Sequence, residues 1–425
     1  MTDLSRIDSQ NIWHPFTPLV GADDPILITE AEGIYLKTAD GRKVMDCISS
    51  WWVNLHGHSN QEIAMAITDQ AQKLEHVIFA GFTHEPAITL SQNLLSILPS
   101  NQTKVFFSDD GSTAVEVGLK MALQYWKNLG VKKTKIVAIE GAYHGDTFGA
   151  MSVGERGLFT HAFADQMFEV EFIPFPAKGF ENITIEAFRK VAETGEVSLF
   201  IYEPLVQGAS GMRIYSRECL EELLTIATQN NVIKLADEVL TGFGRTGKHF
   251  ASDYVAPKPD IIAISKGITG GTLPLGVTSC CKDIVQAFES HEIAKTFFHG
   301  HSYTANPLTC AAANASFNIL LRASTQTQIQ KIGESHKSFV TKIMNHAGVS
   351  DVRNLGTILA IEIKSEAASS YANEDRKLIY KYFLDRNLLL RPLGNVVYVL
   401  PPYVITMEEL DHVYDVITEF LDELL

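Results

Sequence analysis

The sequence lacks the features of a membrane protein, of a disulfide-rich secreted protein and of a nucleic-acid-binding protein. No stretch approaches the ~20 apolar residues of a membrane-spanning helix, and the first residues show no charged-then-apolar signal pattern. The five cysteines form no C-x-x-C pair and no regular spacing, which argues against a disulfide framework. With 35 basic and 50 acidic residues the formal net charge is −15, and no basic run offers a surface for nucleic acid or anionic lipid. We therefore expect a soluble, cytoplasmic protein with reduced cysteines.

The middle of the chain alternates short apolar runs with segments of helical periodicity. The runs are rich in Val, Ile and Phe and are bounded by Gly, Pro or Asp. They are Lys104–Ser108, Lys135–Glu140, Ser198–Glu203, Val232–Glu238 and Asp260–Ser265. Strand–helix alternation of this kind predicts an α/β fold in which a mostly parallel sheet is covered by helices on both faces.

Each predicted strand ends in, or runs into, a polar or glycine-bearing segment. In chain order these segments read DDGST, GAYHGD, EPLVQG, ADE and SKG. In open parallel sheets, ligands gather beyond the carboxyl ends of the strands. We therefore predict that this edge of the sheet carries the functional site.

The two ends of the chain are predicted to form a smaller α+β domain together. Near the N-terminus, ILITEAEGIYLKTADG is strand-like and its ADG is a hairpin signal. Near the C-terminus, NLGTILAIEI and VVYVLPPYVIT resemble strands, and the chain closes on the amphipathic MEELDHVYDVITEFLDELL. We assign residues 1–55 and 326–425 to the smaller domain and residues 56–325 to the large one. No internal repeat, low-complexity segment or long linker interrupts this organisation.

Lys266 and Asp237 each stand at the end of an apolar run. A lysine at a strand end is ordinarily a surface residue when it stands alone. A half-buried aspartate, however, needs a cationic partner, because isolated charge in a low-dielectric interior is costly. A protonated pyridine nitrogen would supply that cation, and a lysine that loses its proton through desolvation can form an imine. The pair predicts an imine-forming site.

The segment Asp110–Thr113 lies between a predicted strand and a predicted helix. Gly111 permits close backbone approach, and the free amides of a helix N-terminus suit a phosphate. An ordinary helix cap by Ser112 or Thr113 explains the spacing equally well. Two His-Gly-His triplets, at 56–58 and 299–301, lack the further ligands that a zinc site requires, so we predict no metal.

Six segments of the chain carry a family resemblance. They read DDGSTAVEVGLKMA, GAYHGDTFGAMS, EPLVQGASGM, LADEVLTGFGRTG, SKGITGGTLPLG and HGHSYTANPLTCAAA. In this combination they resemble the class III, fold-type I pyridoxal-phosphate aminotransferases, from about Asn11 to about Tyr403. The resemblance implies a pyridoxal 5′-phosphate cofactor, a large domain with a mixed sheet, and a homodimer with shared active sites.

The resemblance also implies roles for single residues. Lys266 would carry the cofactor covalently and shuttle a proton, and Asp237 would pair with the ring nitrogen. The other cofactor-binding residues would be Tyr143 against the ring, Gly111 and Ser112 at the phosphate, and the partner's His301 and the partner's Ser302. The substrate would meet Phe16, Trp51, Trp52, Tyr143, Asp146, Arg245, Gly300 and Arg391. The planar fork of an arginine suits a substrate carboxylate, which the resemblance assigns to Arg391. From the residues alone, Trp51 and Trp52 could be core residues and Arg245 could be structural.

Three further segments are most similar to those members of the family that convert 8-amino-7-oxononanoate into 7,8-diaminononanoate in biotin biosynthesis, with S-adenosylmethionine as donor. They are WHPF, SSWWVNLHGH and LLRPLGNVVYVLPPY. Leu240 stands where many members acting on omega-amino acids have Gln. Phe16 stands where these members usually have Tyr, which leaves lysine open as the donor. The remaining alternatives are an aminotransferase for omega-amino acids or diamines, a metal hydrolase, and a non-catalytic regulator, for which no DNA-binding module is appended.

Overall fold

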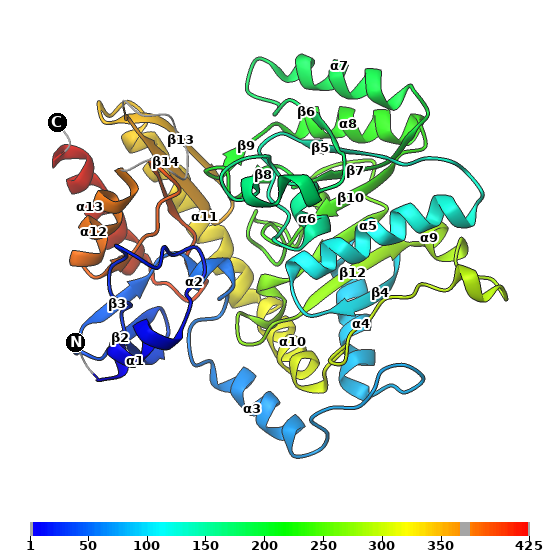
Figure 1. Ribbon diagram of the computed structural model, residues 1–425. Helices are drawn as coiled ribbons and strands as arrows, with labels where there is room; N and C mark the ends of the chain where they lie inside the picture. Colours follow the sequence, from blue (N-terminus) through cyan, green and yellow to red (C-terminus); the bar gives the residue numbers. More distant parts are fainter. Residues whose placement is uncertain (1–2, 366–374, 424–425) are drawn as a thin grey trace.

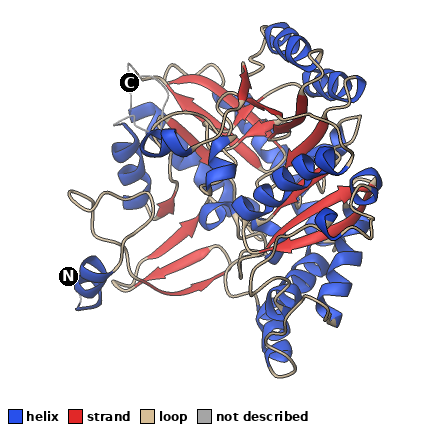
Figure 2. Ribbon diagram, turned by 45° about the vertical axis from the view of Figure 1, so that its right-hand side comes forward, coloured by secondary structure: helices blue, strands red, loops and turns tan. Residues whose placement is uncertain are grey.

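A mixed seven-stranded sheet forms the centre of the computed structural model, which describes residues 3–365 and 375–423. The strands follow the order β4-β12-β11-β10-β7-β5-β6, and Figures 1 and 2 show the sheet among its helices. They are β4 (Gln102–Ser108), β5 (Lys135–Ile139), β6 (Glu171–Ile173), β7 (Val197–Tyr202), β10 (Ile233–Asp237), β11 (Ile261–Ile264) and β12 (Gly276–Cys281). The five predicted strands are confirmed, and β6 and β12 were not predicted. Strand β12 runs antiparallel to both of its neighbours, β11 and β4, and the other strand pairs of this sheet are parallel, so the mostly parallel sheet is also confirmed.

Alternate side chains of the central strands enter two different cores. In β7, Leu199 and Ile201 pack with the helix α5 (Gly111–Asn128), whereas Phe200 and Tyr202 join the core that contains α8 (Arg217–Gln229). These four side chains are fully buried, and burying such a side chain stabilises the fold by about 1.5–3 kcal/mol. Because both faces of the sheet are covered, the strands appear in the sequence as continuous apolar runs.

The remaining elements of this region surround the sheet. The helices are α3 (Gln61–Ala71), α4 (Glu85–Ile97), α6 (Phe148–Ser152), α7 (Glu181–Ala192), α9 (Lys282–Gln286) and α10 (Pro307–Leu320). The 3₁₀ helices are η1 (His161–Gln166), η2 (Ala251–Tyr254), η3 (Lys266–Thr269) and η4 (Ile293–Lys295), and β8 (Val206–Gln207) pairs with β9 (Arg213–Ile214). Among them, α3 packs on α10, and α7 packs on α8.

The two ends of the chain meet in a smaller region to one side of the large sheet (Figure 1). One sheet has the order β1-β2-β3-β15, with β1 (Ile28–Glu32), β2 (Tyr35–Thr38), β3 (Lys43–Asp46) and β15 (Leu388–Leu389). A second sheet contains β13 (Val349–Leu355), β14 (Ile358–Ile363) and β16 (Val396–Val399). The helices here are α1 (Asp3–Asn11), α2 (Ser49–Trp52), α11 (Ala323–Ile343), α12 (Asp375–Asp385) and α13 (Met407–Glu423).

The parallel pairing of β3 with β15 joins the N-terminal and C-terminal parts of the chain, as the sequence predicts. The ADG segment turns the chain between β2 and β3, where the Gly41 amide donates to the Thr38 carbonyl at 3.0 Å. The domain boundaries at 55/56 and 325/326 stay predictions. Residues 1–2, 366–374 and 424–425 of the predicted smaller domain lie outside the described part of the chain. Within residues 3–365 and 375–423, no helix combines the length and apolar character needed to cross a membrane.

Candidate active site

A cavity of about 620 Å³ opens at the carboxyl ends of the large sheet's strands. The segments after β4, β5, β10 and β11 each deliver at least one lining residue. Eight of the residues predicted from the sequence line it: Phe16, Trp51, Trp52, Gly111, Ser112, Tyr143, Asp237 and Lys266. The structure therefore brings the predicted lysine, aspartate and glycine-bearing loop to one cavity.

Lys266 begins η3 directly after β11, with a left-handed φ of +44°. Its Nζ lies 4.9 Å from the ring centroid of Trp52. Loss of solvation lowers the pKa of Lys266, opposed by the carboxylates of Asp237 and Glu203. A lowered pKa favours the neutral amine, which is the form that attacks a carbonyl carbon.

Asp237 ends β10 and is 5% exposed. His144 donates from Nδ1 to Asp237 Oδ2 at 2.7 Å, and the Val239 amide donates to Oδ1 at 3.0 Å. His144 Nε2 is buried and has no hydrogen-bond partner among the described residues. His144 therefore orients the carboxylate. Sequence reasoning quoted this histidine within GAYHGD but gave it no role, although it sits beside the predicted Tyr143.

The N-terminus of α5 offers two spare amides to an anion. Asp110 caps the helix by accepting from the Thr113 amide at 2.8 Å. The amides of Gly111 and Ser112 precede the first intrahelical donor and stay available. A Cβ at Gly111 would lie 2.7 Å from Val239 Cγ1, so only glycine fits here without displacing its neighbour. The helix cap is Asp110 rather than the predicted Ser112 or Thr113, and the phosphate loop stays a prediction.

Glu203 is a buried carboxyl group that sequence reasoning missed. It follows β7, just as Asp237 ends β10, and that parallel position was the available signal. The Tyr143 amide donates to Oε1 at 3.0 Å, and the Gly208 amide donates to Oε2 at 2.8 Å. Burial raises the pKa of Glu203 to about 7, with the Asp237 carboxylate adding to the rise and His144 opposing it.

The raised pKa of Glu203 predicts a pH-dependent stability of the protein freed of bound small molecules. Between pH 4.5 and 7 the folded state holds a proton that the unfolded state releases. The contribution of Glu203 to the free energy of unfolding is therefore fully present below about pH 4.5. It falls by about 3 kcal/mol as the pH rises from there through 7. Glu203→Gln should flatten the fall of the denaturation midpoint between pH 5 and 8. A variant with the same pH profile as the wild type would contradict the assignment.

Two adjacent tryptophans enter the cavity because the chain turns in a left-handed sense. Ser49, Ser50, Trp51 and Trp52 have φ values of +52°, +45°, +74° and +76°. This conformation disfavours L-residues by roughly 1–2 kcal/mol each. Such strain persists where the surrounding structure holds it.

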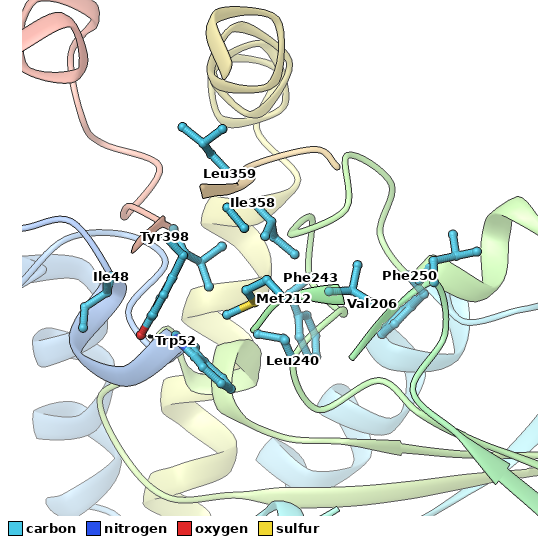
Figure 3. Close-up of a cluster of buried hydrophobic side chains, with 14 of the residues drawn as sticks. Ile48, Trp52, Val206, Met212, Leu240, Phe243, Phe250, Ile358, Leu359 and Tyr398 are labelled. Carbon is cyan, nitrogen blue, oxygen red and sulfur yellow. Dashed lines mark hydrogen bonds between the residues drawn. The ribbon is translucent and has the colours of Figure 1, made fainter. Parts of the chain in front are cut away.

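Each indole has a separate set of contacts. Trp52 donates from Nε1 to the Tyr398 hydroxyl at 3.0 Å and lies beside Leu240 (Figure 3). Trp51 is 40% exposed. Its ring packs edge-on against Phe16 at 5.5 Å and lies 4.8 Å from the Arg391 guanidinium carbon. The structure thus places the predicted Phe16 and Arg391 beside the predicted Trp51.

Six predicted residues are not among the described residues that line this cavity, and one of them, Arg391, lies next to it against Trp51. Asp146 lines an adjoining cavity of about 520 Å³. Arg245 is 1% exposed, and its guanidinium donates to the carbonyls of Pro401, Trp52 and Asn54 at 2.9, 3.3 and 3.2 Å. The described contacts of Arg245 are those of a structural residue, which was the alternative left open by the sequence.

The predicted loop residues Gly300, His301 and Ser302 are not among the described residues that line either cavity. His301 Nε2 lies 3.9 Å from Asp109 Oδ1, on the outer side of the α5 N-terminus. The amide of Tyr303 donates to His301 Nδ1 at 3.2 Å. These contacts fix the loop but leave the prediction that it serves the partner's site untested.

The histidines of the two His-Gly-His triplets have other partners. His56 Nε2 lies 3.1 Å from Ser316 Oγ, and His58 Nε2 lies 2.9 Å from Asp46 Oδ2. His299 Nδ1 accepts from Lys120 Nζ at 2.9 Å. Within the described ranges, no three His, Cys, Asp or Glu side chains form a group that could hold a metal ion.

Comparison with known proteins relates the whole chain to one family. The family model "Aminotransferase class-III" matches residues 20–421. The chain is 47% identical to the adenosylmethionine-8-amino-7-oxononanoate aminotransferase of Synechococcus elongatus, over 97% of this chain and 99% of the relative. A crystal structure of the enzyme of that name from Methanocaldococcus jannaschii superimposes with a TM-score of 0.93 at 36% identity, covering 99% and 98% of the two chains. A PLP-bound amine transaminase from an uncultivated Pseudomonas species gives a TM-score of 0.89 at 27% identity, covering 96% and 97%.

Proposed function

The chain belongs to the class III aminotransferases, and from this premise we propose that it transfers an amino group from S-adenosylmethionine to 8-amino-7-oxononanoate. The product would be 7,8-diaminononanoate, a step of biotin biosynthesis. The names of several relatives, at 34–47% identity, support this choice of reaction. The observation that carries it is the meeting of Lys266, Asp237 and the α5 N-terminus in one cavity.

The residues present fit pyridoxal 5′-phosphate. Asp237 is a buried carboxylate that His144 holds in place, and a cationic ring nitrogen would complete its charge balance. The amides of Gly111 and Ser112 would hold the phosphate. When bound, the cofactor supplies a carbonyl carbon for the incoming amine and an electron-poor ring that stabilises negative charge on the neighbouring carbon.

Side chains of the cavity would hold the cofactor and transfer the proton. The Nζ of Lys266 would be the attachment point and, once released, would take the proton from the carbon that bears the donor amine and pass it to the cofactor carbon that holds the amine, and the second half-reaction would move a proton the opposite way. Its lowered pKa supports that role. Tyr143, whose pKa is raised by burial and by the Asp146 carboxylate, would stay protonated and pack on the ring. One cavity serving two substrates in turn implies ping-pong kinetics.

Substrate recognition is proposed for the wall formed by Phe16, Trp51 and Arg391. The acceptor has a carboxylate at the far end of an apolar chain, so it needs an aromatic channel that ends in a cation. Arg391 beside Trp51 supplies both. Phe16 contributes a ring and no hydroxyl, and it also packs against Phe159 at 5.6 Å. Arg245 is proposed to support the backbone of Trp52 and Asn54 rather than to touch substrate.

We propose that the enzyme works in the cytoplasm as a homodimer. Phe298 and Tyr303, which flank the 300–302 loop, are 69% and 67% exposed in the single chain. Burial of these rings against a second copy would bring the partner's His301 and the partner's Ser302 to the phosphate.

A donor and acceptor panel tests the proposed function. Purified enzyme with cofactor is incubated with 8-amino-7-oxononanoate and either S-adenosylmethionine or lysine, and the product is measured by mass spectrometry. We expect 7,8-diaminononanoate with S-adenosylmethionine and none with lysine. Product with lysine alone would correct the donor and make Phe16 the first residue to exchange. Turnover of β-alanine or putrescine without turnover of the oxononanoate would overturn the proposal.

A further inference from the structure

The left-handed turn Ser49–Trp52 is maintained by one buried carboxylate outside the cavity. Asp46, the last residue of β3, is 0% exposed. Its Oδ1 accepts from the amides of Ile48 at 3.2 Å and Ser50 at 3.0 Å. Its Oδ2 accepts from Ser50 Oγ at 2.7 Å and His58 Nε2 at 2.9 Å. Four donors therefore converge on a single side chain from both sides of the turn.

The ring of His58 is held in one orientation by its second nitrogen. Asn54 donates from Nδ2 to His58 Nδ1 at 3.2 Å, so Nδ1 accepts and Nε2 carries the hydrogen that is donated to Asp46. Burial alone would raise the pKa of Asp46, but the hydrogen bonds from His58 and Ser50 outweigh it and hold the pKa below its ordinary value. The carboxylate is thus ionised and acts only as an acceptor, which is what all four donors require.

The turn decides where both indoles point. In a strand, adjacent side chains face opposite sides. With φ near +75° at both positions, Trp51 and Trp52 instead both line the cavity. One indole lies against Lys266 Nζ and the other against Arg391. Local preference opposes this backbone, so contacts from outside the turn must hold it.

We propose that Asp46 is a positioning residue for amine transfer, which acts through Trp51 and Trp52 by holding the left-handed turn that presents both indoles to the substrates. This inference rests on the proposed function. It assigns a role in the reaction to a side chain that is not among the described residues lining the cavity. If Asp46 were purely structural, its replacement would lower stability, and any effect on kcat/KM would not depend on the two indoles.

The test is a double-mutant cycle on the holoenzyme. Asp46→Asn keeps the size of the side chain but turns one acceptor into a donor, which faces Ser50 Oγ and His58 Nε2. We expect kcat/KM for the acceptor to fall about 10- to 100-fold, chiefly through KM, with the absorbance band of the bound cofactor unchanged. In a Trp51→Ala background the same substitution should lower kcat/KM by a clearly smaller factor than in the wild type, because one of the two indoles through which Asp46 acts is gone.

The matched control is Asp40→Asn, in the turn between β2 and β3. Asp40 accepts from Arg42 Nε at 3.0 Å and is solvent-exposed, so this variant should keep wild-type kinetics. If Asp46→Asn does not fold, Ser50→Ala removes one donor alone and should lower kcat/KM about two- to tenfold in the same direction. Equal effects of Asp46→Asn with and without Trp51, or kinetics within twofold of the wild type, would overturn the inference.

The activity of the wild-type enzyme distinguishes a failure of the proposed function from a failure of this inference. If it fails to aminate 8-amino-7-oxononanoate, the proposed function fails. The cycle is then measured with the amine that the wild type does accept, so that the role of Asp46 is still decided by the ratio between variants.

Discussion

Replacement of Lys266 by alanine is expected to abolish amine transfer. Lys266 carries an amine at the end of β11 inside the cavity, and no other described lysine lines it. The loss removes both the covalent attachment and the proton carrier, so turnover should fall by at least about 10³-fold. The measurement combines steady-state rates with the absorbance spectrum of the purified protein, in which the band of the lysine-bound cofactor should be missing.

Lys282→Ala is the matched control for this experiment. Lys282 is an exposed lysine at the start of α9, beyond the opposite end of the neighbouring strand β12. Its removal should leave both the spectrum and the rate unchanged. A Lys266→Ala protein with full transaminase activity would refute the assignment of the site.

Replacement of Asp237 by asparagine is expected to have the second-largest effect. The substitution keeps the shape of the side chain and removes the negative charge from a position that is 5% exposed. A protonated ring nitrogen would then lose its counter-charge, and removal of one such preorganised electrostatic group lowers kcat by about 10²–10³-fold. Stopped-flow measurement of the first half-reaction should show the loss in the proton-transfer step.

Asp283→Asn, an exposed aspartate on α9, is the corresponding control and should retain wild-type rates. If Asp237→Asn reacts within twofold of the wild type, Asp237 is not the partner of a cationic ring. His144, which donates to Asp237 at 2.7 Å, would then be the next residue to test.

The sequence predicts the strands of the large sheet well where burial makes them continuously apolar. It does not predict β12, whose sequence is GVTSCC. That strand is fully buried although it contains hydroxyl groups, because Thr278 Oγ1 donates to the Ala114 carbonyl at 2.6 Å and Ser279 Oγ donates to Gln102 Oε1 at 2.7 Å. These partners lie more than 150 residues away in the chain, so no local sequence pattern predicts these hydrogen bonds.

In the candidate site, too, some residues can be predicted from the local sequence and others cannot. Lys266 and Asp237 are predictable because each is a polar residue that ends a buried strand. Arg245 is not, because its carbonyl partners at Pro401 and Trp52 lie 156 and 193 residues away. The left-handed turn at Ser49–Trp52 is unpredictable for a further reason: local backbone preference favours another conformation, and tertiary hydrogen bonds override it.

The small sheet is completed by the last part of the chain, and this has a consequence for how the protein folds while it is being synthesised. Ser49 donates to the carbonyl of Leu400 at 2.8 Å, across 351 residues of sequence. At about 5–20 residues per second, a ribosome needs roughly 20–70 s to make that span. During this time β3 has no β15 beside it and its edge is open to other chains. The strands of the large sheet are all made once Cys281 has been added, whereas the proposed substrate wall needs Arg391 and therefore forms later.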